Sequence, residues 1–128
     1  LKIKPLKHTQ VLPDILSTIE IYDLDDFKIA AMTVEKKIMR ILQNDTEELI
    51  DFPRNILGIE FAILYKEISD REIEVSLRSR ILNVSKISLS LGGGGHKRAA
   101  GCTINASLKE AKDIVNQAIL KYIKDMKV

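Results

Sequence analysis

The sequence predicts an α/β domain in which helices flank a mixed sheet of roughly five strands. Residues 58–68 are nearly continuously apolar, which is typical of a strand that is buried on both faces. Residues 73–80 alternate between apolar and polar side chains, which indicates a strand with one exposed face. Residues 107–123 carry apolar side chains at helical spacing, and this pattern predicts an amphipathic helix.

The N-terminal half predicts smaller elements around the central strand. Residues 8–16 suit a short helix, and Pro13 either limits this helix or opens a second turn. Residues 17–22 and 27–34 are rich in β-forming residues, and the aspartate-rich residues 23–26 between them predict a hairpin turn. These aspartates lack other metal ligands at a useful spacing, so we predict no metal site in the turn.

Two helices are expected between this hairpin and the central strand. Residues 35–43 place apolar side chains on one helical face. Asp45 and Glu48 resemble the capped start of a second helix, which must stop near Pro53. Both helices are expected to cover the sheet.

The C-terminal half continues with a turn at residues 69–71 and the alternating strand, in which Leu77 faces the core and Arg78 faces away from it. Asn83 or Ser85 can cap a following helix that ends where a run of glycines begins. Residues 99–104 predict another strand. Ser107 with Glu110 forms a capping box for the last helix.

Length and composition indicate one ordinary globular domain over residues 1–128. The chain is 45% hydrophobic and 30% charged, and it has no apolar run near the ~18 residues that a membrane-spanning helix needs. We therefore expect no membrane contact by this domain and a cytoplasmic location. The chain begins with Leu1 rather than methionine, so we expect a C-terminal piece of a longer protein, with residues 1–13 as a linker or N-terminal extension.

The charged side chains are unevenly distributed along the chain. Residues 14–74 carry 15 acidic and 7 basic side chains, whereas residues 75–109 carry 6 basic side chains and no acid. Such a block favours a positive local field suited to a ligand that bears phosphate. Chance clustering stays open as an alternative, because these charges need not converge in space.

Four consecutive glycines, Gly92, Gly93, Gly94 and Gly95, lie inside the acid-free block and precede His96, Lys97 and Arg98. Such a run permits positive φ angles and can direct successive backbone N–H groups into one concavity, so a phosphate is the predicted ligand. Arg78 could reach the same ligand with its planar fork. The alternatives are a flexible linker, an Arg78 paired with Glu74, and a His96 that serves only as a turn residue.

Three motifs in this region resemble a known family. They are Ser-Leu-Arg-Ser at residues 76–79, Val-Ser-Lys-Ile at residues 84–87, and Gly-Gly-Gly-Gly-His-Lys-Arg-Ala-Ala-Gly at residues 92–101. In this order and spacing they closely resemble the C-terminal substrate-binding domain of the DHH-family phosphoesterases, which include nano-RNases, phosphoadenosine phosphate phosphatases and RecJ-type exonucleases. The resemblance is firm over residues 58–118 and carries no motif before them.

The resemblance implies a substrate-binding role without chemistry. Arg78, Gly93, Gly94, Gly95 and His96 would hold the nucleotide, and the full set of predicted substrate-binding residues adds Ser79, Gly92 and Lys97. No residue of this chain is predicted to be catalytic or to bind metal, since it has no Asp-His-His motif and only two histidines. The resemblance places catalysis in an N-terminal domain of the same polypeptide, where two divalent metals, usually manganese, activate water.

The substrate stays open at this point. The His-Lys-Arg-Ala-Ala-Gly ending is similar to that of bacterial nano-RNases and phosphoadenosine phosphate phosphatases, so the predicted partner is a nucleotide or short single-stranded RNA or DNA. A cyclic dinucleotide phosphodiesterase is an alternative. A third is a non-catalytic tRNA-binding or dimerising module, as in alanyl-tRNA synthetases, although His96 and Lys97 count against it. A homodimer remains a further hypothesis, as does a module in which the glycines only form a tight turn.

Overall fold

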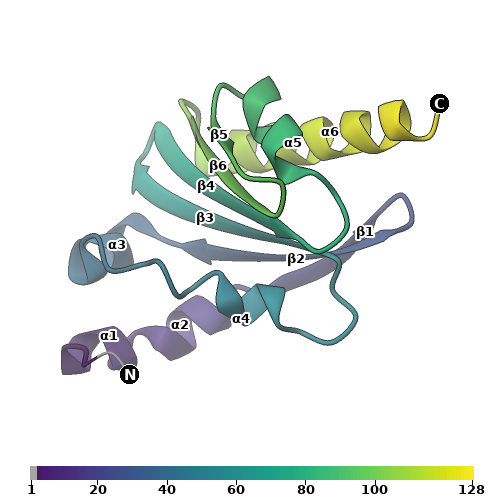
Figure 1. The fold of residues 1–128 in the computed structure, drawn as a ribbon. Coiled ribbons are helices and arrows are strands. Elements are labelled where there is room, and N and C mark those ends of the chain that lie inside the picture. The colour runs from purple at the N-terminus through teal and green to yellow at the C-terminus, as the bar shows by residue number, and fades with distance from the viewer. Residues whose placement is uncertain (1–2) are drawn as a thin grey trace.

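A computed structural model describes residues 3–128, so the first two residues of the predicted extension lie outside the described part. Its strands are β1 (Glu20–Leu24), β2 (Phe27–Val34), β3 (Phe61–Ser69), β4 (Glu72–Ser79), β5 (Gly94–Gly95) and β6 (Ala99–Ile104). Its helices are α1 (Leu6–Gln10), α2 (Leu12–Leu16), α3 (Lys36–Leu42), α4 (Asp51–Arg54), α5 (Val84–Ser90) and α6 (Leu108–Met126). Figure 1 shows their arrangement.

The strands form one mixed sheet in the order β1-β2-β3-β4-β6-β5. β2 and β3 are parallel, and all other neighbours are antiparallel. The predicted fold class is confirmed, with six strands rather than about five. The additional strand is β5, which consists of two glycines and therefore has no side-chain pattern that could indicate a strand.

The apolar run at residues 58–68 contains the predicted buried strand. β3 lies between β2 and β4, and its residues from Phe61 to Tyr65 are all buried. Side chains on one side of β3 join the core under α5 and α6, and those on the other side join the core under α2, α3 and α4. A strand needs apolar side chains at every position when both of its faces are covered.

The structure defines two N-terminal predictions more closely. The turn between β1 and β2 consists of Asp25 and Asp26 only, with Asp25 at φ +54°, while Asp23 belongs to β1. Residues 8–16 belong to two short helices, α1 and α2, and Pro13 lies in the first turn of α2, which agrees with the predicted alternative that Pro13 opens a second turn. Proline fits there because the first N–H groups of a helix have no intrahelical acceptor.

The predicted helix start at Asp45 is wrong, because the helix in this segment, α4, begins only at Asp51 and contains Pro53. The Asp45 carboxylate accepts hydrogen bonds from Lys4 Nζ at 2.7 Å and faces His8 Nδ1 at 3.2 Å. Its partners lie about forty residues away in sequence, so a local capping pattern could not reveal them. Asp45 therefore ties α1 to the segment that follows α3 instead of starting a helix.

The C-terminal helix predictions are confirmed. The Asn83 side chain accepts a hydrogen bond from the Ser85 N–H and caps α5, which decides between the two predicted caps. Ser107 and Glu110 exchange the two hydrogen bonds of a capping box at the start of α6. On the inner face of α6, Val115, Ile119 and Ile123 are completely buried.

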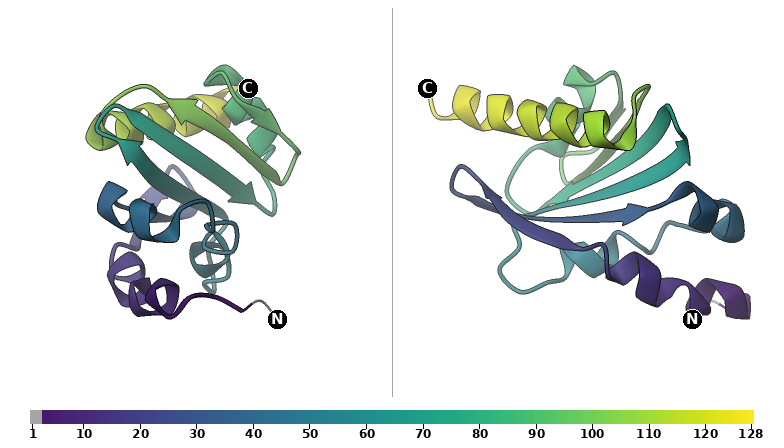
Figure 2. Two further views of the ribbon diagram at one scale, coloured as in Figure 1. Left: turned by 90° about the vertical axis from the view of Figure 1, so that its left-hand side faces the viewer. Right: turned by 180° about the vertical axis from the view of Figure 1, so that it is seen from behind.

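The helices cover the two faces of the sheet unequally (Figure 2). α5 and α6 pack on one face, over residues of β2, β3, β4 and β6. On the other face, α2, α3 and α4 pack over β2 and β3, whose buried side chains there include Met32, Ala62 and Leu64, and α1 packs on α2 and α3. The second face of β4, β6 and β5 therefore has no helix of the described chain packed on it, and we call this surface the open face.

Candidate functional site

The open face carries the arginine that the sequence singles out. Leu77 is completely buried on the core face, whereas Arg78, one residue later, is half-buried on the open face, as predicted. The Arg78 guanidinium donates to the carbonyl oxygen of Leu77 at 3.0 Å. No carboxylate of residues 3–128 forms an ion pair with it, and Glu74 instead pairs with Lys66 at 3.6 Å. The alternative of an Arg78–Glu74 pair is therefore wrong.

The surroundings of Arg78 lower the pKa of its guanidinium, first through burial and then through the nearby positive charge of Arg54, while Asp51 acts in the opposite direction. An arginine remains charged under such conditions. Arg78 is thus a desolvated cation without a full counter-charge on its side of the sheet.

The strand register brings His96 to the same face. Arg78 lies opposite Ala99 on the adjacent strand β6. Ala99 and His96 in turn exchange two backbone hydrogen bonds, at 2.8 and 3.2 Å, so they are also direct neighbours. Residues opposite each other on neighbouring strands share a face, so Arg78, Ala99 and His96 form a row across the open face. Two strand spacings separate the Cα atoms of Arg78 and His96 by about 10 Å.

The first two glycines of the run end helix α5. Gly92 has a φ of +84°, and its N–H donates to the carbonyl oxygen of Leu89. The Gly93 N–H donates to the carbonyl oxygen of Ser88 at 2.8 Å. This pair of bonds is the Schellman motif, in which a glycine at positive φ closes the last turn. Because both N–H groups are used within the fold, they are not directed at a ligand.

Two glycines are required by close packing of the backbone. A Cβ atom on Gly93 would lie 2.1 Å from the carbonyl oxygen of Gly101 and 2.6 Å from the Cβ of Cys102. A Cβ atom on Gly95, whose φ is +140°, would lie 2.5 Å from the Cα of Ala100. Neither position can hold a side chain without displacing β6.

Gly94 is different, because the fold gives no reason for its missing side chain. It has no positive φ, and a Cβ atom placed on it would meet nothing within 4 Å. It lies opposite Gly101, which lies opposite Ser76, and strand alternation therefore puts Gly94 on the open face with His96. The space above Gly94 is free for a ligand to approach the backbone.

The β5–β6 hairpin also leaves a donor at the edge of the sheet. His96 and Ala99 form a hydrogen-bonded pair, so the next pair, Gly95 and Ala100, is a non-hydrogen-bonded one. The Gly95 N–H therefore points outward from the sheet. Among the backbone N–H groups of the glycine run, which were predicted to point into one concavity, that of Gly95 is therefore directed at solvent.

Two further predicted residues have structural partners. The hydroxyl of the buried Ser79 donates to the carbonyl oxygen of Glu60 at 2.9 Å and accepts from the N–H groups of Ile81 and Leu82. These bonds use the hydroxyl to shape the loop after β4. Lys97 is exposed at the hairpin tip, and its carbonyl oxygen accepts from the Val84 N–H, which holds the hairpin against α5.

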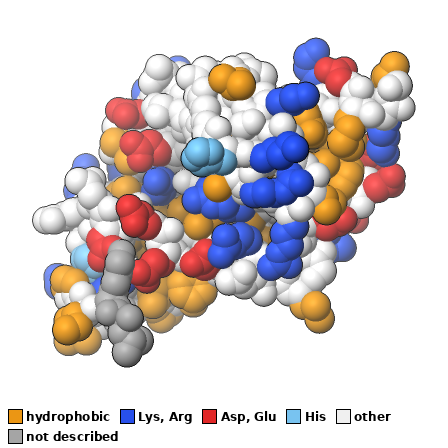
Figure 3. Space-filling model, in the orientation of Figure 1, with side chains coloured by type: hydrophobic (Ala, Val, Ile, Leu, Met, Phe, Trp, Pro, Cys, Tyr) orange, Lys and Arg blue, Asp and Glu red, His pale blue; other side chains and the backbone are white. Residues whose placement is uncertain are grey.

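Sequence reasoning gave no binding role to Arg80, Arg98 or Arg54, and of these only Arg54 lies outside the acid-free block. This residue belongs to the acidic half of the chain, but it ends α4 beside the open face. A hollow of about 460 Å³ lies there, lined by Arg54, Asn55, Ser79, Arg80 and Arg98. Figure 3 shows lysine and arginine side chains gathered on this side of the molecule. The acid-free block thus contributes to a positive surface, although Lys86 and Lys109 of the same block lie on helices α5 and α6.

The described chain gathers no potential metal ligands into a cluster, and its one thiol is buried. In the part of the chain that the structure describes, no group of three or more His, Cys, Asp or Glu side chains is arranged to hold a metal ion. Cys102 lies on β6 and is buried in the core under α5 and α6, and burial raises the pKa of its thiol to about 11. The thiol therefore stays protonated at neutral pH and acts as a small apolar side chain.

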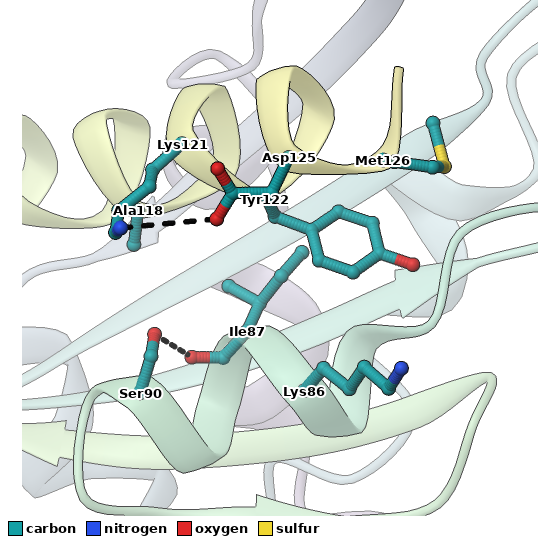
Figure 4. A pocket seen from close by; sticks show the side chains of 8 residues that line it. All are labelled: Lys86, Ile87, Ser90, Ala118, Lys121, Tyr122, Asp125 and Met126. Carbon is teal, nitrogen blue, oxygen red and sulfur yellow. Dashed lines mark hydrogen bonds and ion pairs between the residues drawn. The ribbon is translucent and has the colours of Figure 1, made fainter. Parts of the chain in front are cut away.

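A second groove, of about 380 Å³, lies between α5 and α6 on the helix-covered side of the sheet (Figure 4). Its floor is formed by Ile87 and Tyr122, and its α6 charges, Lys121 and Asp125, pair with each other at 3.7 Å. It contains none of the predicted substrate-binding residues. The arrangement of cations therefore favours the open face as the candidate site.

Comparisons with known proteins agree with the motifs. The DHHA1 domain family matches residues 26–125. The chain is 30% identical over 90 residues to the bifunctional oligoribonuclease and PAP phosphatase NrnA of Mycoplasma genitalium. The match spans 69% of this chain but only 28% of that relative.

Solved structures share the fold. An exopolyphosphatase-related protein from Bacteroides fragilis superposes with a TM-score of 0.81 at 23% identity, covering 98% of this chain and 38% of that protein. The pGpG-specific phosphodiesterase PggH from Vibrio cholerae gives 0.56 at 17% identity, covering 94% and 40%. The C-Ala domain of Aquifex aeolicus alanyl-tRNA synthetase gives 0.52 at 16%, covering 79% and 98%.

The family match extends from the β1–β2 turn almost to the end of α6, and it therefore includes the open face, the glycine run and the row of Arg78, Ala99 and His96. This chain belongs to the DHHA1 domain family, the domain found in DHH phosphoesterases.

Proposed function

We propose that this domain binds a nucleotide, or the nucleotide end of a short single-stranded oligonucleotide, on its open face. It would hold this ligand for an N-terminal catalytic domain of the same polypeptide, which would supply the metal-dependent cleavage of the phosphodiester. The two divalent metals, manganese by our expectation, would belong to that domain. The domain itself would contribute position and no chemistry.

The vacant space above Gly94 is the observation that carries this proposal. Three glycines of the run are explained by the helix end and by backbone packing, whereas Gly94 opens onto the row that holds Arg78 and His96. Arg78 can donate two hydrogen bonds to a phosphate. His96, which is exposed, can donate a further hydrogen bond or stack on a base. The outward N–H of Gly95 adds a backbone donor.

The substrate of the whole protein is a separate proposal. We favour a short-RNA exonuclease or phosphoadenosine phosphate phosphatase, because the relative from Mycoplasma genitalium is named for both activities. A cyclic dinucleotide phosphodiesterase is the alternative, and a tRNA-binding or dimerising module is another. Because the chain spans 28% of that relative, these activities are proposals for a longer protein. No helix in residues 3–128 combines the length and apolar character needed to cross a bilayer, and a cytoplasmic location stays our expectation.

Titration of the 128-residue chain with AMP and with the dinucleotide pApA, followed by amide chemical shifts, tests the proposal. We expect shifts in residues 76–79 and 92–98. Replacing Arg78 by Gln should weaken binding by about 10- to 100-fold, which corresponds to the ~1.5–3 kcal/mol of hydrogen bonds to a charged group. A module in which the glycines only form a turn predicts no change.

Arg71→Gln is the matched control. Arg71 lies just before β4, seven residues or about 23 Å of extended strand from Arg78, and it forms only an exposed ion pair with Glu110. This variant should bind like the original chain. Shifts confined to the groove between α5 and α6 would contradict the proposal.

A further inference from the structure

The hollow beside the open face has the composition of an anion site. Its lining combines three arginines from separate segments: Arg54 from the end of α4, Arg80 from the loop after β4, and Arg98 from the β5–β6 hairpin. Asn55 adds an amide, and no carboxylate lines the hollow. A smaller cleft shares Arg54, Ser79 and Arg80 with this hollow, and its lining adds Arg78 together with Glu60.

The arginines of the hollow are only partly neutralised. Arg54 pairs with Asp51 of its own helix at 2.8 Å. Arg98 donates to the carbonyl oxygen of Leu82 at 2.9 Å, which positions it without cancelling its charge. Within residues 3–128, neither Arg80 nor Arg98 forms an ion pair with a carboxylate. Three like charges around one hollow repel one another, so a bound anion there would be favoured.

Chain connectivity places this hollow next to the row on the open face. Arg80 follows Arg78 by two residues, so their Cα atoms are at most about 7 Å apart. The carbonyl oxygen of Arg98 accepts from the Ser79 N–H, which fixes the hairpin tip beside the end of β4. A ligand bound at Arg78 would therefore lie next to the hollow and could extend directly into it.

We propose that Arg54, Arg80 and Arg98 form a second anion subsite, which binds a second phosphate group of the ligand whose first phosphate lies at Arg78. The inference rests on the proposed function, since it assumes that a nucleotide occupies the open face. It goes beyond that function by requiring a ligand with two phosphate groups and by assigning a recognition role to three residues outside the predicted set. The second group is a terminal phosphate or a further backbone phosphodiester.

Three dinucleotide and trinucleotide probes separate these sources. ApA has one phosphodiester, pApA adds a terminal phosphate, and ApApA adds a second phosphodiester. We expect the 128-residue chain to bind pApA, ApApA or both about 10-fold more tightly than ApA. A gain with pApA alone assigns the hollow to a terminal phosphate, and a gain with ApApA alone assigns it to the oligonucleotide backbone.

Arg80→Gln is the diagnostic variant, because Arg80 is exposed and its replacement should leave the fold intact. In this variant, the gain in affinity of pApA or ApApA over ApA should fall to less than about 3-fold, while the Kd for ApA stays unchanged. Arg71→Gln should keep the full gain in affinity. If ApA shifts the open face but the second phosphate adds no affinity, or if Arg80→Gln keeps the gain, the inference fails and the proposed function stands. If ApA produces no shifts on the open face, both fail.

Discussion

Replacing each of the four glycines by alanine, one at a time, should separate those that the fold needs from the one that it does not. At Gly93, the new Cβ would overlap the carbonyl oxygen of Gly101 at 2.1 Å, and at Gly95 it would overlap Ala100 at 2.5 Å. Backbone atoms can move only with their strand, so each change should lower the free energy of unfolding by at least the ~1–3 kcal/mol typical of overpacking.

The other two glycines should behave more mildly and differently from each other. Gly92 has open space around it but a φ of +84°, so alanine there should cost about 1–2 kcal/mol of conformational energy. Gly94 has open space and no positive φ, so alanine there should change stability by less than ~0.5 kcal/mol or stabilise the chain by up to ~1 kcal/mol.

Urea unfolding followed by circular dichroism measures this series, with equal slopes confirming that the four variants unfold alike. The reasoning is refuted if Gly94→Ala destabilises the chain as much as Gly93→Ala does. A companion variant, Gly94→Val, should remain folded yet bind pApA at least about 10-fold more weakly, because its side chain would occupy the space above β5. Unchanged binding by the folded valine variant would remove Gly94 from the site.

Three further predictions concern stability. Ser79→Ala should lower the free energy of unfolding by about 1–3 kcal/mol, because it leaves buried N–H groups of the following loop without an acceptor; thermal melting measures the loss. Ser107→Ala should cost about 1 kcal/mol through loss of the capping box of α6, and urea unfolding measures it. The hydrogen bond from Lys4 lowers the pKa of Asp45. The stabilisation by this hydrogen bond should therefore be complete well above the ordinary pKa of 3.8 and be lost as the pH falls below 3.8. Unfolding midpoints measured from pH 6 to pH 3 should fall more steeply in the original chain than in Asp45→Asn.

Each of these three stability predictions has its own comparison variant or contrary result. A Ser90→Ala variant, which removes a hydroxyl bonded only to the Ile87 carbonyl oxygen on the surface of α5, should change stability much less than Ser79→Ala, and an equal loss would argue against the loop explanation. Glu110→Gln should retain part of the α6 cap that Ser107→Ala loses. Parallel pH curves for the original chain and Asp45→Asn would show that the Lys4 contact contributes nothing.

Much of the fold follows from sequence because its signals are local. The run from Phe61 to Tyr65 has apolar side chains throughout, and the Ser107–Glu110 box is a four-residue pattern. The side of β4 on which Arg78 lies follows from simple alternation. In each case the residues that determine the element are neighbours along the chain.

The predictions that failed or were incomplete depend on distant partners or on absent side chains. Asp45 was open to a capping interpretation because its real partners, Lys4 and His8, lie far away in sequence. Arg54 joins the arginine hollow only through the packing of α4 on β2 and β3. Strand β5 is made of glycine alone, so no pattern of side chains could indicate it.

The brevity of β5 also has a consequence for how this sheet meets other chains. A long, apolar edge strand invites pairing with another copy and aggregation, but this edge offers two residues before the hairpin turns back. At the opposite edge, β1 carries the charged Glu20 and Asp23, and Tyr22 bonds to Asn116 of α6 at 2.9 Å. Sheet extension is thus discouraged at both ends. If two copies associate, we expect them to meet through helices rather than through a continuous intermolecular sheet.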